Sequence, residues 1–298
     1  MERLPNLNPE KIALGKQLFH DKKLSHNQKM NCASCHNLNQ GGVDNVRFAT
    51  DAYGNKLNIN TLSVFNTAFN VGLFWDGRGK GEPSYHTALL DHIRLLSKSV
   101  KYMIKDLKQD GFYQSQVKKL YRTELTEDVI VDALKSYLYS LVALNSKFDQ
   151  YLKGNQQALT EQEKQGYYLF KVYGCISCHQ GKNIGGNVFQ KFGIIVPYFS
   201  KREAGNKTSL GRYNVTKDER DKNTFKVPSL RNVALTYPYY HNGKTASLEQ
   251  AVYEMGLYQL GRKIEKQNVA AIVAFLKTLT GEPPKPGPKN SEKTDEGL

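Results

Sequence analysis

Two short cysteine motifs carry most of the chemistry that this 298-residue chain can support. They read "NCASCH" and "GCISCH", and they contain all the cysteines of the chain, each pair followed by a histidine: Cys32, Cys35, His36, Cys175, Cys178 and His179. C-x-x-C-H is the attachment signal of c-type haem. The two thiols form thioethers with the haem vinyl groups, and the adjoining histidine becomes the proximal iron ligand. The sequence therefore predicts two covalently bound haem c groups.

Two other uses of paired cysteines fit the spacing less well. A zinc ribbon places its second pair within about twenty residues of the first, whereas Cys35 and Cys175 stand far apart. A thioredoxin-like redox pair has no need of a histidine after both second cysteines. Haem attachment accounts for every residue of both motifs.

The repeat extends to the helices that must position the motifs. "GKQLF" at residues 15–19 and "GYYLF" at residues 166–170 each precede one motif. Asn8 before a proline predicts the start of the first helix, and Thr160 with Glu163 predicts a capping box for the second. Two copies of this arrangement predict a mainly α fold of two c-type cytochrome domains, each with one attached haem.

Local signals set the expected domain limits. A helix beginning after Thr126 has an apolar stripe on one face, and the chain then breaks at "LKGNQQALT", near Gly154. The expected domains are residues 1–154 and 155–282. The proline-rich, polar residues 283–298 predict a disordered tail.

Composition argues against a membrane-spanning chain. No apolar run reaches about eighteen residues, and the N-terminal segment lacks the apolar stretch of a signal peptide. A net charge of +14, with a pI near 9.4, suits an acidic partner, nucleic acid or an anionic membrane. The basic residues are scattered along the chain, which favours a solvated basic surface and no nucleic-acid partner.

The second axial ligand is expected to differ between the two irons. Met255 follows the second motif on a helix beginning at Ser247, where thioether ligands of c-type cytochromes typically stand; a core methionine is the alternative. His/Met ligation raises the reduction potential and closes an iron to substrates. No such methionine is evident for the first haem, because Met103 is expected in the core and Met30 stands beside Cys32. An iron that is open, or held by a labile histidine, beside a closed one indicates an enzyme.

Longer segments resemble the bacterial diheme cytochrome c peroxidases and their relatives, including the diheme enzymes that mature methylamine dehydrogenase. The resemblance runs from Pro9 to Glu282 and is carried by "CASCHNLNQGGVDN", "SVFNTAFNVGLFWDGR" and "FKVPSLRNVALTYPYYHNG". It implies two cytochrome domains whose haems face each other. Haem attachment outside the bacterial cytoplasmic membrane implies a periplasmic protein whose signal has been removed, and relatives are often homodimers.

The resemblance also implies roles for single residues. Met255 matches the axial ligand of the C-terminal haem, and Trp75 matches an electron relay between the haems. His241 matches a histidine kept close to a haem, where a purely structural role is an equal alternative. A calcium ion between the domains would be bound, mainly through oxygen atoms, by Asn60, Thr236 and Pro238.

Two departures from the family pattern concern the first haem. The loop "VRFATDAYGNKLNIN" has no histidine to bind the first iron, which predicts access without reductive activation. The family's distal glutamate is replaced in "DHIRL" by Arg94, which can stabilise a leaving hydroxide but cannot act as a base, since its pKa exceeds about 12. His92 is the candidate acid/base, with iron ligation and solvent exposure as alternatives.

Three functions follow. In a peroxidase, electrons from a small acidic cytochrome c or cupredoxin would enter at the Met255 haem, pass Trp75 and reduce hydrogen peroxide at the His36 haem. A side-chain-oxidising enzyme would act on a protein, as the maturation enzymes do. An electron carrier would have both irons six-coordinate. The missing glutamate weakens the first hypothesis, whereas the absence of a tyrosine at position 255 favours it over the second.

Overall fold

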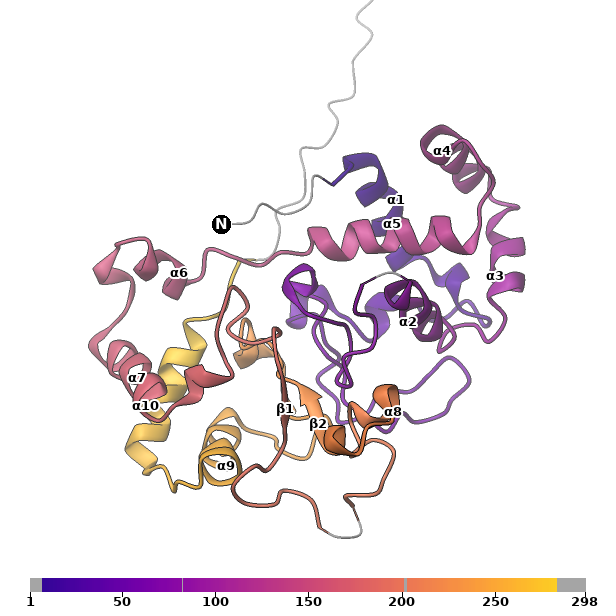
Figure 1. Ribbon diagram of the computed structural model, residues 1–298. Helices are drawn as coiled ribbons and strands as arrows, with labels where there is room; N and C mark the ends of the chain where they lie inside the picture. Colours follow the sequence, from indigo (N-terminus) through magenta and orange to yellow (C-terminus); the bar gives the residue numbers. More distant parts are fainter. Residues whose placement is uncertain (1–6, 82, 201–202, 283–298) are drawn as a thin grey trace, which may run out of the picture.

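The computed structural model describes residues 7–81, 83–200 and 203–282; the predicted tail at 283–298 lies outside them. In this part the chain is mainly helical, with one small antiparallel sheet (Figure 1). The prediction of a mainly helical protein is confirmed. None of the described helices is both long and apolar enough to cross a bilayer.

The helices fall into two groups along the chain. The N-terminal group is α1 (Pro9–His20), α2 (Ser84–Ile93), α3 (Val100–Leu107), α4 (Gly111–Tyr121) and α5 (Glu127–Ser140). The second group is α6 (Lys147–Leu152), α7 (Glu161–Val172), α8 (Tyr213–Thr216), α9 (Leu248–Leu260) and α10 (Lys266–Lys277). Strands β1 (Phe189–Lys191) and β2 (Thr224–Lys226) pair antiparallel. Each cysteine motif begins with a single turn of 3₁₀ helix, Cys32–Ser34 and Cys175–Ser177.

Side-chain caps explain where several helices begin. Asn8 accepts hydrogen bonds from backbone N–H groups of the first turn of α1, and Thr160 and Glu163 form a reciprocal capping box at α7. Thr126 and Ser247 cap α5 and α9 in the same way. These helix starts agree with the sequence prediction.

The glycine of the repeated G-x-x-L-F segment allows the same helix crossing in both halves. At Gly15 of α1, an added Cβ would lie 2.0 Å from the carbonyl oxygen of Ala133 in α5. At Gly166 of α7, it would lie 1.9 Å from the carbonyl oxygen of Ala271 in α10. Only glycine lets two backbones approach so closely. The repeat therefore encodes helix packing as well as haem attachment.

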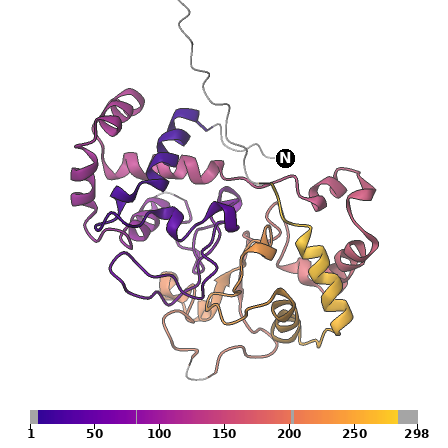
Figure 2. The ribbon, with the colours of Figure 1, turned by 180° about the vertical axis from the view of Figure 1, so that it is seen from behind.

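Two hydrophobic cores follow from these crossings. The first is built on α1 to α5 and includes Met103, which is buried as expected. The second is built on α6, α7, α9 and α10. Phe148 of α6 belongs to the second core, so the change of core along the chain precedes Gly154. The two halves lie side by side in both views (Figure 1, Figure 2).

Backbone groups join the halves. The backbone N–H of Lys226 donates to the carbonyl oxygen of Trp75 at 2.9 Å. The side-chain amide of Asn45 donates to the carbonyl oxygen of Leu235 at 2.8 Å. The first bond pairs a backbone N–H of the buried residue Lys226, which burial would otherwise leave unsatisfied.

Gly166→Ala tests the close crossing of α7 and α10. The added methyl must push the two backbones apart, and we expect the free energy of unfolding to fall by about 2 kcal/mol or more. Thermal or denaturant unfolding of the haem-loaded protein measures the loss. Gly111→Ala is the control, since nothing lies within 4 Å of a Cβ at that helical position. Equal stability of the two variants would contradict the packing argument.

Candidate active site

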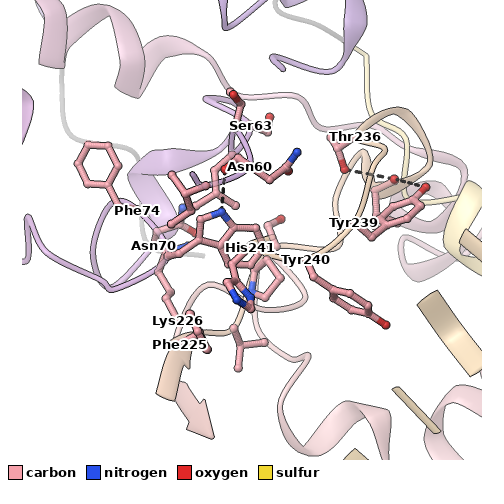
Figure 3. A pocket seen from close by; sticks show the side chains of 18 of the residues that line it. Asn60, Ser63, Asn70, Phe74, Phe225, Lys226, Thr236, Tyr239, Tyr240 and His241 are labelled. Atoms are coloured by element: carbon pink, nitrogen blue, oxygen red, sulfur yellow. Dashed lines mark hydrogen bonds between the residues drawn. The ribbon is translucent and has the colours of Figure 1, made fainter. Parts of the chain in front are cut away.

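One mostly apolar cavity of about 530 Å³ brings both cysteine motifs together. Its lining includes every predicted haem-site residue: Cys32, Cys35, His36, Cys175, Cys178, His179, Met255 and His241. Trp75, His92, Asn60, Thr236 and Pro238 line the same cavity. Figure 3 shows one wall, where Phe225, Tyr240 and His241 gather. Segments far apart in the sequence thus meet in one space.

The first motif is held in a tight, capped turn. Asn31 and Ser34 form a capping box around the turn at Cys32, and the backbone N–H of His36 donates to the carbonyl oxygen of Cys32 at 2.9 Å. Nδ1 of the buried His36 lies 3.2 Å from the carbonyl oxygen of Gly42. Nδ1 must be the protonated nitrogen to donate there, which leaves Nε2 with a free lone pair as a ligand nitrogen requires.

The second motif repeats the backbone turn of the first, but its N-cap residue is Gly174, which offers no side-chain cap. The backbone N–H of His179 donates to the carbonyl oxygen of Cys175 at 3.0 Å. Burial lowers the pKa of His179 to about 4 and raises the pKa of the Cys175 thiol to about 11. His179 is therefore neutral near pH 7, and the cysteines of both motifs are free thiols. A neutral imidazole beside two unpaired thiols is the donor set that covalent haem attachment uses.

Other buried polar groups also fit a bound haem. Nε2 of His241 is buried and has no hydrogen-bond partner among the described residues. The buried side chain of Lys226 lines the cavity, and burial lowers the pKa of its ammonium to about 8. An anionic group beside it would favour the charged form, and haem propionates are such groups. Lys226 lies in the segment "FKVPSLRN", where no motif signals a role for a lysine.

Trp75 is fixed in the wall of the shared cavity. Its Nε1–H donates to the carbonyl oxygen of Asn60 at 2.9 Å, and its ring meets that of His241 edge-on at 6.3 Å. His241 stacks in turn on Phe225, with ring centroids 4.3 Å apart. The indole also belongs to an aromatic cluster with Phe192 and Phe225, against which Met255 packs.

His92, in the last turn of α2, faces the first motif. Its Nε2 lies 3.4 Å from Nε2 of His36, and its ring lies 5.3 Å from that of Phe74. Burial, with smaller effects of His36 and Arg78, lowers the pKa of His92 to about 3. His92 is half-buried and lines the cavity, so its ring faces the cavity.

Arg94 does not face the first motif, contrary to the expectation from "DHIRL". Its side chain is 52% exposed and forms an ion pair with Asp91. Residues two positions apart lie on nearly opposite sides of a helix, so the orientation of His92 turns Arg94 outward. Arg78 does line the cavity; it lies 3.9 Å from the centroid of Phe74 and donates to Asp76 at 2.6 Å.

Asn60 has its side chain fixed by two backbone carbonyl groups. Its Nδ2 donates to Val46 at 3.1 Å and to Arg47 at 3.3 Å, and its backbone N–H donates to His241 at 2.7 Å. Its Oδ1 is left as the side-chain atom available to a cation. The hydroxyl of Thr236 donates to the carbonyl oxygen of Val233 at 3.2 Å. This hydrogen bond fixes the orientation of the hydroxyl group.

Comparisons with known proteins agree with this site. Residues 9–157 match the family model described as di-haem cytochrome c peroxidase. The chain is 42% identical over 281 residues to cytochrome c551 peroxidase of Nitrosomonas europaea, a match that covers 93% of this chain and 82% of the relative. It is 40% identical over 287 residues to the cytochrome c peroxidase Ccp of Escherichia coli, covering 94% of this chain and 60% of the relative's length.

One solved structure has a similar fold. The crystal structure of a MauG-like protein associated with microbial copper homeostasis matches with a TM-score of 0.81 and 25% identity. The match covers 93% of this chain and 91% of that protein. Both described halves are therefore included in the shared fold.

Removal of one cysteine pair tests the number of attached haems. We expect two covalently bound haems per chain by intact mass and pyridine haemochrome assay, and one in the Cys175→Ser, Cys178→Ser double variant, because a serine oxygen forms no thioether. The matching variant of Cys32 and Cys35 is the control and should also retain one. Two haems in either double variant would contradict attachment through these motifs.

Proposed function

Because the chain belongs to the di-haem cytochrome c peroxidase family, we propose that this enzyme reduces hydrogen peroxide with electrons from a small redox protein. The overall reaction consumes one peroxide, two electrons and two protons and yields two waters. The observation that carries the proposal is the cavity that both haem motifs share with Trp75. The haem at His36 would supply the iron that reacts with peroxide, and the haem at His179 and Met255 would store and deliver electrons.

Met255 is proposed as the ligand that closes the second iron. It stands on α9 and packs against the aromatic cluster that contains Trp75. A thioether ligand raises the reduction potential of its haem. This position would couple the electron-accepting centre directly to the proposed relay.

Trp75 is proposed as that relay. Its ring is buried, and hydrogen bonds at Nε1 and at its carbonyl oxygen anchor it to both halves of the chain through Asn60 and Lys226. A ring held in this way keeps its orientation during turnover. It would therefore give electrons a fixed route across the boundary between the halves.

His92 and Arg78 are proposed to assist cleavage of the peroxide bond. The reaction needs a proton moved from one oxygen to the other, and His92 is the titratable side chain opposite His36. Arg78 carries a permanent positive charge and lines the same cavity. Such a charge stabilises the hydroxide that forms as the bond breaks.

A calcium ion is proposed at Asn60, Thr236 and Pro238. All three line the cavity, and the Asn60 amide is oriented with its oxygen free. Calcium prefers amide and backbone carbonyl oxygens of this kind. The ion would bridge the N-terminal half, which contains Asn60, and the C-terminal half, which contains the other two.

The setting of the enzyme is also a proposal. Covalent haem attachment supports a periplasmic location, and the net charge of +14 supports an acidic cytochrome c or cupredoxin as the electron donor. A homodimer is the proposed assembly, by analogy with the family. Residues 1–154 and 155–282 are proposed as the two haem-binding domains, with α6 packing on the second core.

A second candidate function is oxidation of a protein side chain. It is supported by the shared fold with the MauG-like protein. The same two haem sites would serve it, with a protein in place of the electron donor. The peroxidase function is favoured if the enzyme consumes peroxide with a reduced small cytochrome when no protein substrate is present.

Trp75→Phe tests the relay. We expect both haems to remain attached and peroxide-dependent oxidation of a reduced cytochrome to fall by about tenfold or more, because phenylalanine neither binds Asn60 nor is as readily oxidised. Phe192→Leu, in the same aromatic cluster, is the control and should change the rate little. A Trp75→Phe enzyme as fast as wild type would remove the residue from the electron route.

Arg78→Gln tests the cation of the cavity. We expect kcat/KM for peroxide to fall by about a hundredfold, the usual cost of removing a group that stabilises developing charge. Arg94→Gln is the matched control, and its steady-state rate should equal that of wild type, since its side chain points to solvent. A rate loss in Arg94→Gln, with an unchanged rate in Arg78→Gln, would instead assign this role to Arg94, as "DHIRL" suggested.

A further inference from the structure

A second cavity, of about 500 Å³, lies between the two halves of the chain. The N-terminal half contributes Arg47, Phe48 and Asn58 to its lining, and the C-terminal half contributes residues near Phe199 and Lys244. Among the described residues, Asn58 is the one that also lines the cavity of the haem motifs. Ligand sites often have this size and lie between two structural units. The proposed peroxidase reaction gives this second cavity no role.

Positive charge predominates in the lining of the second cavity. Arg47, Lys207 and Lys244 line it together with one carboxylate, that of Glu203. Lys244 forms an ion pair with Glu203, whose carboxylate also accepts from the hydroxyl of Ser200 at 3.0 Å. Arg47 and Lys207 have no ion-pair partner among the residues that the structure describes. Two cations therefore remain to attract an anion into the cavity.

The guanidinium group of Arg47 is oriented by its neighbours. Its Nε donates to the carbonyl oxygen of Asn242 at 3.1 Å, and its central carbon lies 4.9 Å from the centroid of the Phe48 ring. Gly243 packs closely on the backbone of Arg47, where an added Cβ would lie 2.9 Å from the carbonyl oxygen. The terminal nitrogens of Arg47 donate to none of the described residues. They are the atoms with which arginine binds a carboxylate at two points.

Two phenylalanine rings give the same cavity apolar walls. Phe48 and Phe199 are both half-buried in its lining. Phe199 also packs against the ring of His241, with centroids 5.5 Å apart, which fixes its position. Aromatic rings favour packing against other rings. A bare inorganic anion would leave both walls in contact with water, whereas an aromatic anion would cover them.

We propose that this cavity binds a small aromatic carboxylate. Its carboxylate contacts Arg47 and Lys207, and its ring lies against Phe48 and Phe199. The ligand touches both halves of the chain, so it binds only where the halves are folded and in place. It therefore stabilises the folded protein by mass action. The site does not depend on which reaction takes place at the haems.

Binding of benzoate to the haem-loaded, full-length protein tests the site. Titration calorimetry should show one benzoate per chain, and the unfolding temperature should rise with benzoate concentration. Acetate has the charge without the ring, and benzyl alcohol has the ring without the charge. Each should bind at least about tenfold more weakly than benzoate. Acetate that binds as tightly as benzoate would indicate an adventitious ion only and would overturn the proposal.

Single substitutions locate the bound carboxylate. Arg47→Gln and Lys207→Gln should each weaken benzoate binding by about tenfold, because each removes a charged contact. Glu203→Gln should strengthen binding, since it frees the ammonium of Lys244. Lys105→Gln is the matched control: it removes the same charge from an exposed position on α3 and should leave the affinity unchanged.

Two results would contradict the site. One is the absence of benzoate binding by the wild type, and the other is an equal affinity in the wild type and in both cation variants. Neither measurement uses peroxide or an electron donor. A protein that binds benzoate as expected but does not reduce peroxide would support the site while rejecting the peroxidase function.

Discussion

The direct contact of two helix backbones at a glycine, made once in each half, is the constraint on which the site depends. It sets α1 against α5 and α7 against α10, and each cysteine motif follows the first helix of its pair. Asn31, at the start of the first motif, donates its side-chain amide to the carbonyl oxygen of His20 at the end of α1, at 2.6 Å. The helix crossing therefore sets the position of each proximal histidine. A bulkier residue in place of the glycine would displace that histidine.

Backbone hydrogen bonds and aromatic side chains together form the boundary between the halves. Asn60 accepts from the Trp75 indole through its carbonyl oxygen and donates through its backbone N–H to the carbonyl oxygen of His241, so one residue anchors the indole and the backbone of His241. Buried polar groups that are paired in this way fix a unique geometry. Rings that are held rigidly need little rearrangement when an electron passes, which suits a route between two centres.

Much of the protein could be predicted from its sequence. The motifs, the caps at Asn8 and Thr160, and a helical fold follow from local chemistry. Met255 and Trp75, which were singled out by resemblance, both line the cavity that the two motifs share. The distal side of the first haem site could not be predicted. Tertiary packing decides how a short helix such as α2 is rotated about its axis. The sequence "DHIRL" alone therefore does not predict that His92 points inward and Arg94 outward. Arg78 was missed because its cation reaches the cavity through contact with Phe74.

The hydrogen bond from His36 to Gly42 has a consequence for reactivity. A carboxylate acceptor would draw the Nδ1 proton and give the ring partial imidazolate character, making it a stronger electron donor to a bound metal. A backbone carbonyl oxygen is a weaker acceptor, and it leaves the ring close to neutral imidazole. In this protein the electron density needed to break an oxygen–oxygen bond would thus come less from the proximal ring and more from the partner centre across the cavity.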